Sequence, residues 1–271
     1  MILALTQLLV PICLTVPYHY QYQLVLDPRL WLLIFGTLLV ASAGYVINDY
    51  YDVKIDSINK PKRVTIDRQF SRTTAIWLHT VLNLTGIGLA YFAGLKVAIL
   101  TFLSAFLLWI YSNHLKRLPL VGNLLIGILA GLSVLMPLIY LQQHTPIGWV
   151  VATLAMVLTW VREVVKDMED LKGDKTFGCR TLPIAIGLRQ TKFVIYGFVL
   201  ILLVTLALSI LMGWVGAGWM RYHLWLMMPF LLHFVLLLFA ADTTGQYRAL
   251  SKYAKLLMLA GVLSILWYPW N

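Results

Sequence analysis

The chain has 271 residues, of which 61% are hydrophobic and only 12% carry a charge, and its mean hydropathy is +0.82. Because about a quarter of the residues in an ordinary soluble domain are charged, this composition excludes a soluble globular protein. It indicates an integral membrane protein, with a formal net charge of +10.

Charge-free windows mark the expected membrane spans in chain order. They cover residues 1–26, 30–48, 73–95, 97–115, 118–161, 193–220, 222–241 and 256–271. Since a spanning helix needs about 20 apolar residues, the window 118–161 holds two spans, separated near residues 142–148. The sequence therefore predicts about nine transmembrane helices with short connections, in a single domain over residues 1–271.

Positive charge alternates between successive connections. The connections after the second, fourth, sixth and eighth expected spans, with the adjoining helix ends, hold 18 of the 21 Lys and Arg residues. By the positive-inside bias, these connections and the N-terminus are expected in the cytoplasm, with the protein in the cell inner membrane. Topology, anionic lipid and an anionic ligand at that face account for the net charge, so no nucleic-acid partner is expected.

Acidic residues are concentrated in two short segments at the same face. Nine of the eleven Asp and Glu residues follow the second or the sixth expected span. Each segment contains three aspartates at positions i, i+3 and i+7, which lie on one face of a helix. These two triads are Asp49, Asp52 and Asp56, and Asp167, Asp170 and Asp174. The repeated spacing also predicts two repeats of four helices.

Three like charges on one helical stripe repel each other unless a cation neutralises them. Oxygen-only ligands suit Mg²⁺, which keeps several waters and takes one or two carboxylates together with substrate phosphate oxygens. Two facing triads would therefore hold metal fully only when a diphosphate bridges them. Solvated carboxylates at helix ends are the alternative, but here the same spacing occurs twice and few acids lie elsewhere.

Basic residues flank both triads and fit an anionic ligand. Arg offers a two-pronged guanidinium group and Lys offers a point charge to phosphate oxygens. Any one of these cations could instead serve only the positive-inside bias. The candidate substrate-binding residues are Lys62, Arg63, Tyr111, Lys116, Arg117, Arg162, Lys166 and Lys175.

The segments NDYYDVKID, residues 48–56, and DMEDLKGD, residues 167–174, carry a family resemblance. Their patterns, N-D-x-x-D-x-x-x-D and D-x-x-D-x-x-x-D, resemble the two motifs of the UbiA superfamily of intramembrane prenyltransferases. With YSNHLKR at residues 111–117 between them, the resemblance covers essentially the whole chain. It implies an all-α, ring-like bundle with a central cavity, capped on the cytoplasmic side by the two motif loops.

The resemblance also implies a chemistry. A polyprenyl diphosphate would lie with its head between two Mg²⁺ ions and its tail in an apolar tunnel open to membrane lipid, and loss of diphosphate would leave an allylic carbocation for the acceptor to attack. No nucleophilic serine or cysteine is needed, and no obligate protein partner is evident. The implied catalytic residues are Asn48, Asp49, Asp52, Asp56, Asp167, Asp170 and Asp174, with Asn48, Asp49, Asp52, Asp170 and Asp174 as metal ligands.

The acceptor is less well defined. The motif segments are most similar to the branch of the family that resembles digeranylgeranylglyceryl phosphate synthase, which implies a geranylgeranyl donor and a geranylgeranylglyceryl phosphate hydroxyl as acceptor. Relatives that form quinones share the metal motifs and prenylate 4-hydroxybenzoate or dihydroxynaphthoate. An aromatic acceptor therefore stays open.

Proteins of other classes could also carry membrane-embedded acids. A secondary transporter would place them near mid-membrane rather than at one face. A lipid-binding membrane protein would need the cations but not two carboxylate triads. A CDP-alcohol phosphotransferase would need a D-G-x-x-A-R stretch, which the sequence lacks. The transporter and the lipid-binding protein stay as alternatives to the enzyme.

Overall fold

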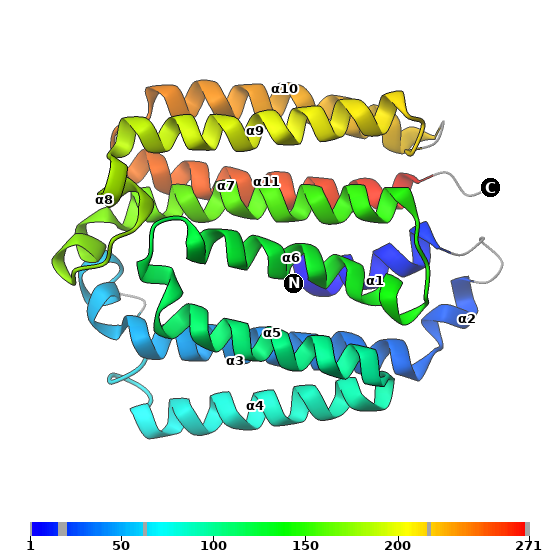
Figure 1. Ribbon diagram of the computed structural model, residues 1–271, viewed down its shortest axis with the longest axis horizontal. Coiled ribbons are helices and arrows are strands. Elements are labelled where there is room, and N and C mark those ends of the chain that lie inside the picture. The colour runs from blue at the N-terminus through cyan, green and yellow to red at the C-terminus, as the bar shows by residue number, and fades with distance from the viewer. Residues whose placement is uncertain (1, 16–20, 62–63, 216–217, 269–271) are drawn as a thin grey trace.

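The computed structural model describes residues 2–15, 21–61, 64–215 and 218–268. Over these residues the protein is all-α, which confirms the predicted fold class, and its long helices lie side by side along one axis (Figure 1). The elements are α1 (Ile2–Leu14), α2 (Gln21–Val25), α3 (Pro28–Asn59), α4 (Arg72–Ala93), α5 (Leu95–Asn113), η2 (Leu115–Arg117), α6 (Val121–Tyr140), α7 (Pro146–Thr176), α8 (Leu182–Ile186), α9 (Leu188–Leu211), α10 (Trp219–Ala240), α11 (Thr244–Ser264) and η3 (Ile265–Trp267).

Local sequence signals set where the long helices begin. Asp27 caps α3 by accepting a 2.9 Å hydrogen bond from the backbone N–H of Arg29. Ser71 caps α4 in the same way, and Thr243 and Gln246 form a capping box at α11. These polar side chains satisfy N–H groups that the start of a helix leaves without partners. Short polar connections can therefore turn the chain between apolar spans.

Eight helices in the described part of the chain are long and apolar enough to cross a membrane. They are α3, α4, α5, α6, α7, α9, α10 and the α11–η3 segment. The first of the nine expected spans is α1, whose 13 residues rise only about 20 Å, less than a bilayer core of about 30 Å. The ninth span and the two four-helix repeats stay predictions.

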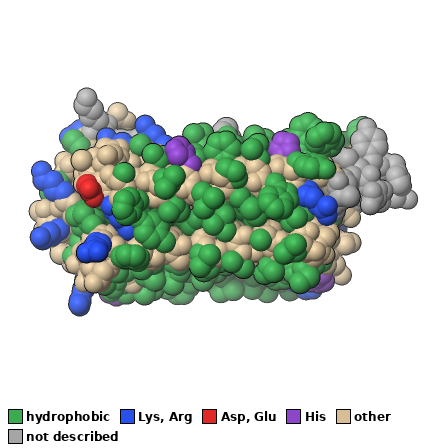
Figure 2. Space-filling model, turned by 90° about the horizontal axis from the view of Figure 1, so that it is seen from above, with side chains coloured by type: hydrophobic (Ala, Val, Ile, Leu, Met, Phe, Trp, Pro, Cys, Tyr) green, Lys and Arg blue, Asp and Glu red, His purple; other side chains and the backbone are tan. Residues whose placement is uncertain are grey.

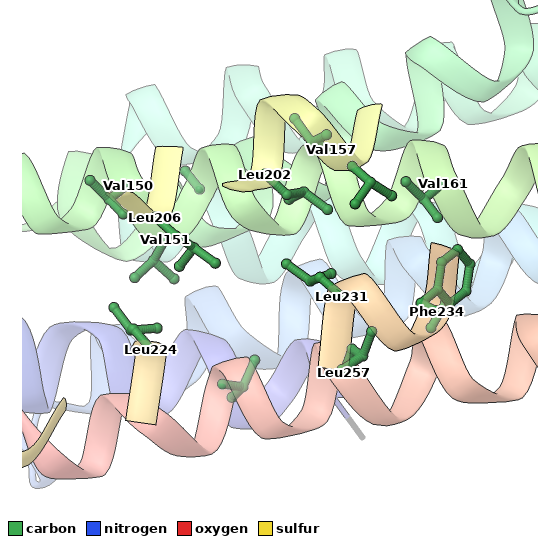
Figure 3. Packing of buried hydrophobic residues seen from close by; sticks show 14 of the residues in the cluster. Val150, Val151, Val157, Val161, Leu202, Leu206, Leu224, Leu231, Phe234 and Leu257 are labelled. Atoms are coloured by element: carbon green, nitrogen blue, oxygen red, sulfur yellow. The ribbon is translucent and has the colours of Figure 1, made fainter. Parts of the chain in front are cut away.

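The largest buried cluster surrounds α7. Val157 and Val161 of α7 pack with Leu202 of α9, Phe234 of α10 and Leu257 of α11 (Figure 3). Branched side chains interlock here at no more than 5% exposure, so dispersion contacts hold α7 rigidly against three other helices. The second acid triad therefore stands on the best-supported helix of the bundle.

The outer surface carries the apolar side chains that a membrane protein needs. Hydrophobic groups cover the middle of the face shown in Figure 2, and most Lys and Arg side chains gather at one end. On the peripheral helix α4 only 17% of the apolar window is buried within the protein. Exposed residues such as Trp77 and Phe92 are suited to contact lipid instead.

Both acid motifs lie inside long helices. The prediction that loops carry them is wrong, because α3 continues through residues 48–56 to Asn59 and α7 continues through residues 167–174 to Thr176. Pro61 follows the end of α3, where a proline cannot continue the helical hydrogen bonds. Gly178, at φ +70°, follows α7 in the left-handed conformation that glycine adopts without strain. Each aspartate triad is thus a stripe on a helix of fixed geometry.

Candidate active site

The two acid stripes meet at one end of the bundle. The C-terminal ends of α3 and α7 both lie at the end marked by α8 (Figure 1). There the Asn59 side chain donates a 2.9 Å hydrogen bond to the carbonyl of Asp170 and accepts one of 2.8 Å from the N–H of Gly173. Lys60 Nζ lies 2.5 Å from Asp170 Oδ2. The first motif helix is therefore joined directly to the second.

A cavity of about 720 Å³ opens between these helices and continues into the apolar interior. Its wall comes from α1, α3, α5, α6, α7, α10 and α11, so the helices surround it as the predicted ring does. Seven carboxylates line one end, namely Asp49, Asp52, Asp56, Glu163, Asp167, Asp170 and Asp174. Farther along, Leu132, Val151, Leu154, Leu224 and Leu257 line the wall. The cavity thus has an acidic head and an apolar body.

One lysine neutralises the middle of the first stripe. Lys116 Nζ lies 2.7 Å from Asp52 Oδ1 and 3.2 Å from Asn48 Oδ1, and Asn48 Nδ2 donates to Asp52 Oδ2 at 2.9 Å. Burial lowers the pKa of Lys116, and the charge of Asp52 acts in the opposite direction. The short 3₁₀ turn η2 holds Lys116 against α3, since Lys116 Nζ also lies 3.4 Å from the Asn48 carbonyl.

The donor set fits the predicted magnesium. Asp170 Oδ1 is buried and has no hydrogen-bond partner in the described part of the chain, so one carboxylate oxygen is left for a cation. Within the described residues, no three Asp, Glu, His or Cys side chains already gather around one point. Carboxylates spread over two facing stripes suit a cation that takes its remaining ligands from substrate oxygens.

The other predicted catalytic residues also face this cavity. Asn48 lines it, and Asp167 Oδ2 accepts a 2.8 Å hydrogen bond from Asn123 Nδ2 of α6. Tyr111, predicted to bind substrate, lines it too. Among the predicted substrate-binding cations, Lys116, Arg162 and Lys166 line the cavity as well.

Two predicted cations lie elsewhere. Arg117 and Lys175 are exposed and do not line the cavity. Lys62 and Arg63 fall outside the described residues.

Two further residues of this site, Asn59 and Asn123, were not predicted from the sequence. A signal for Asn59 was present, because it follows Asp56 by three residues and extends the stripe at positions 49, 52 and 56. No comparable signal marks Asn123, whose contact with Asp167 joins residues 44 apart in sequence. The cysteines, Cys13 and Cys179, are free and buried.

This fold and site define a membrane-embedded prenyltransferase. The chain belongs to the UbiA prenyltransferase family, whose sequence model matches residues 8–269.

Several archaeal relatives share a more specific name. The digeranylgeranylglyceryl phosphate synthase of Thermococcus kodakarensis is 34% identical over 190 residues, covering 70% of this chain and 68% of the relative. The synthase of the same name from Pyrococcus furiosus is 32% identical over 239 residues, covering 87% of this chain and 80% of the relative. The chain is therefore most similar to this branch of the family, as its motif segments predict.

Solved structures share the fold. A digeranylgeranylglyceryl phosphate synthase superposes with a TM-score of 0.73 at 24% identity, covering 97% of this chain and 90% of the other. A UbiA homologue from Aeropyrum pernix gives 0.78 at 14% identity, covering 98% and 96%. One from Archaeoglobus fulgidus, bound to GPP and Mg²⁺, gives 0.71 at 14% identity, covering 97% and 95%.

Proposed function

We propose that this protein transfers a geranylgeranyl group from its diphosphate to the free hydroxyl of geranylgeranylglyceryl phosphate, in a reaction that depends on Mg²⁺. The observation that carries the proposal is the joining of the two aspartate stripes at the head of one cavity whose body is apolar. A diphosphate fits the head of this cavity and an isoprenoid tail fits its body. The names of the relatives support the choice of donor and acceptor.

The charge balance of the cavity supports the metal requirement. Within the described part of the chain, four cationic side chains line it together with the seven carboxylates, namely Lys60, Lys116, Arg162 and Lys166. Among these described residues carboxylates exceed cations by three, which disfavours a diphosphate without metal. Two Mg²⁺ ions, held by Asn48, Asp49, Asp52, Asp170 and Asp174, would reverse this excess and stabilise the charge on the leaving diphosphate.

The side chains of the cavity would then orient the two substrates and shield the carbocation from water. The bond between the first prenyl carbon and the diphosphate oxygen breaks, and the acceptor oxygen bonds to that carbon while its proton passes to a cavity carboxylate. Lys60 and Lys116 are close enough to the stripes to turn from the carboxylates to the diphosphate oxygens. Apolar walls keep water from the allylic carbocation, and the Tyr111 ring lines the same cavity.

Orientation follows from charge. The motif end carries exposed cations at Lys54, Lys172, Lys175, Arg180 and Arg189. The positive-inside bias then places this end, and the diphosphate entrance, at the cytoplasmic face of the cell membrane.

The function is tested with the purified protein, labelled geranylgeranyl diphosphate and a panel of glyceryl phosphate and aromatic acceptors. Asp52→Asn and Asp170→Asn are each expected to lower the rate of diphosphate release about 10²- to 10³-fold, because each removes charge that acts on the leaving group. Asp242→Asn is the matched control, since Asp242 is 85% exposed and lies outside the cavity. Chelation of divalent metal should stop release, and Mg²⁺ should restore it.

Product identification then decides the acceptor. Mass spectrometry should show a second geranylgeranyl ether on glyceryl phosphate. A prenylated hydroxybenzoate as the preferred product would replace the acceptor but keep the enzyme class. Unchanged diphosphate release in both aspartate variants would contradict the prenyltransfer mechanism.

A further inference from the structure

One cluster in the cavity differs in charge from the rest of its acidic head. On α7, Arg162 Nη1 contacts Glu163 Oε1, and Lys166 Nζ lies 3.6 Å from Glu163 Oε2. Two cations thus share a single carboxylate. Glu163 itself is buried, with 9% of its side chain accessible, so it is committed to this pair. The cluster is the cationic part of an otherwise acidic wall.

The other two cavity lysines are already paired one to one. Lys60 with Asp170 and Lys116 with Asp52 form ion pairs whose side chains are only 9% to 16% accessible. By contrast, 30% of the Arg162 side chain and 35% of the Lys166 side chain stay accessible, and both line the cavity. Among the described residues, Arg162 makes one side-chain hydrogen bond and therefore keeps most of its five N–H donors for a ligand.

The cluster lies deeper along α7 than Asp170 and Asp174. Lys166 and Arg162 precede Asp170 on α7 by four and eight residues, which corresponds to about 6 Å and 12 Å along the helix axis. They lie on the side of Asp170 that leads to the apolar body of the cavity, where Leu158 and Leu154 follow. A prenyl diphosphate anchored at Asp170 and Asp174 would direct its reacting carbon toward Lys166 and Arg162.

We propose, on the basis of the prenyl transfer argued above, that Arg162 and Lys166 form the subsite for the anionic group of the acceptor. A phosphate or a carboxylate bound there accepts the guanidinium fork of Arg162 and the ammonium group of Lys166, while Glu163 holds both cations in place. The nucleophilic atom of the acceptor, a few bonds from this anion, then lies beside the first prenyl carbon.

The subsite explains what the two acceptor classes have in common. Geranylgeranylglyceryl phosphate carries a phosphate near its free hydroxyl, and 4-hydroxybenzoate carries a carboxylate. Neutral alcohols and phenols lack this group and leave the two cations without a partner. The cluster is therefore expected to select acceptors by charge, separately from the selection of the donor.

The test compares kinetic constants for donor and acceptor in the full-length protein. Arg162→Gln and Lys166→Met are assayed with geranylgeranylglyceryl phosphate and with geranylgeranylglycerol, and, in parallel, with 4-hydroxybenzoate and phenol. Each variant should raise the KM for the anionic acceptor about tenfold to a hundredfold, because one charge-assisted hydrogen bond is lost. The KM for the donor should stay unchanged, and the preference for the charged acceptor over its neutral counterpart should fall.

Three controls make the result specific. Lys172→Met and Arg189→Gln remove the same charges from exposed positions outside the cavity and should change neither KM. Arg162→Lys keeps the charge and should recover part of the acceptor affinity. An unchanged melting temperature in detergent shows that a variant is folded.

Different outcomes overturn different claims. A rise in the KM for the donor alone would assign Arg162 and Lys166 to the diphosphate and overturn the subsite. Equal use of charged and neutral acceptors by the unmodified protein would overturn it as well, while leaving prenyl transfer intact. If no acceptor is prenylated and no diphosphate is released, the proposed function itself fails. The unmodified protein should prefer the charged over the neutral acceptor more strongly in one of the two acceptor pairs. That pair shows whether the bound anion is a phosphate or a carboxylate.

Discussion

Asn59 and Gly173 hold the two motif helices of the active site together. The Asn59 carboxamide is bonded to two backbone groups one turn apart on α7, at 2.8 Å and 2.9 Å. A Cβ atom at position 173 would lie 2.4 Å from Asn59 Nδ2, so only glycine leaves room for this contact. Asn59 therefore sets the distance between the two aspartate stripes, through one hydrogen bond that its side chain donates and one that it accepts.

Asn59→Ala should weaken the contact between α3 and α7. Loss of two hydrogen bonds is expected to lower the free energy of unfolding by about 1 to 3 kcal/mol. Because the spacing of the stripes relaxes, the Mg²⁺ concentration for half-maximal activity should rise roughly tenfold. Thermal unfolding in detergent and an Mg²⁺ titration measure the two effects. Asn113→Ala, at an exposed position at the same end, is the control, and an unchanged Mg²⁺ requirement would reduce Asn59 to a purely structural residue.

The effect of Gly173→Ala on stability should change sign when Asn59 is also replaced by alanine. In the unmodified protein the new methyl group displaces the Asn59 carboxamide and destabilises the fold. In the Asn59→Ala background the obstacle is gone, and alanine is a better helix former than glycine by up to about 1 kcal/mol. The same substitution should then be neutral or stabilising. A double-mutant cycle measures the coupling, and additive effects would contradict the contact.

Replacing either residue of the ion pair between α7 and α11 is expected to lower the melting temperature, but by different amounts. Arg248 Nε lies 2.9 Å from Glu169 Oε1, and the side chains are 50% and 7% accessible respectively. Arg248→Met leaves a buried carboxylate without its partner, whereas Glu169→Met leaves an arginine that water can reach. The melting temperature should therefore fall further for Arg248→Met, although Arg248 is the more exposed residue. Equal shifts would contradict the burial of the Glu169 carboxylate.

The membrane orientation can be read from labelling. Single cysteines are placed at Ser57, at the motif end of α3, and at Gln143, in the connection between α6 and α7 at the opposite end. On intact cells an impermeant maleimide should label Gln143→Cys, and it should label Ser57→Cys only after lysis. The reverse pattern would place the diphosphate entrance outside the cell.

The native cysteines should give little background in this experiment. Cys13 and Cys179 are buried at 4% and 6% exposure. Burial raises the pKa of the Cys179 thiol, and the nearby charge of Asp174 raises it further, so less of the reactive thiolate is present near pH 8. Labelling of Cys179 should become faster as the pH rises above 9 and after denaturation. Replacing both cysteines by serine should preserve activity, because neither acts as a nucleophile in the proposed reaction.

The amino-acid sequence alone determined the membrane class and the position of the acid motifs. Long charge-free windows cannot remain in water, and the i, i+3, i+7 spacing of Asp49, Asp52 and Asp56 faces one way on any α-helix. These properties depend only on composition and helical period, so they needed no knowledge of neighbouring helices. The motif loops, which the family resemblance implied, were wrong, because α3 and α7 continue through both motifs.

The tertiary structure alone decided how these pieces meet. Asn59 reaches Gly173 across 114 residues, and Asn123 reaches Asp167 across 44. Packing between helices also separates Lys166, which lines the cavity, from Lys175, which is exposed, although both lie on α7. No local pattern encodes such distances, because they depend on which faces of separate helices are buried together. The partners of each charge in this active site therefore follow from the packed bundle.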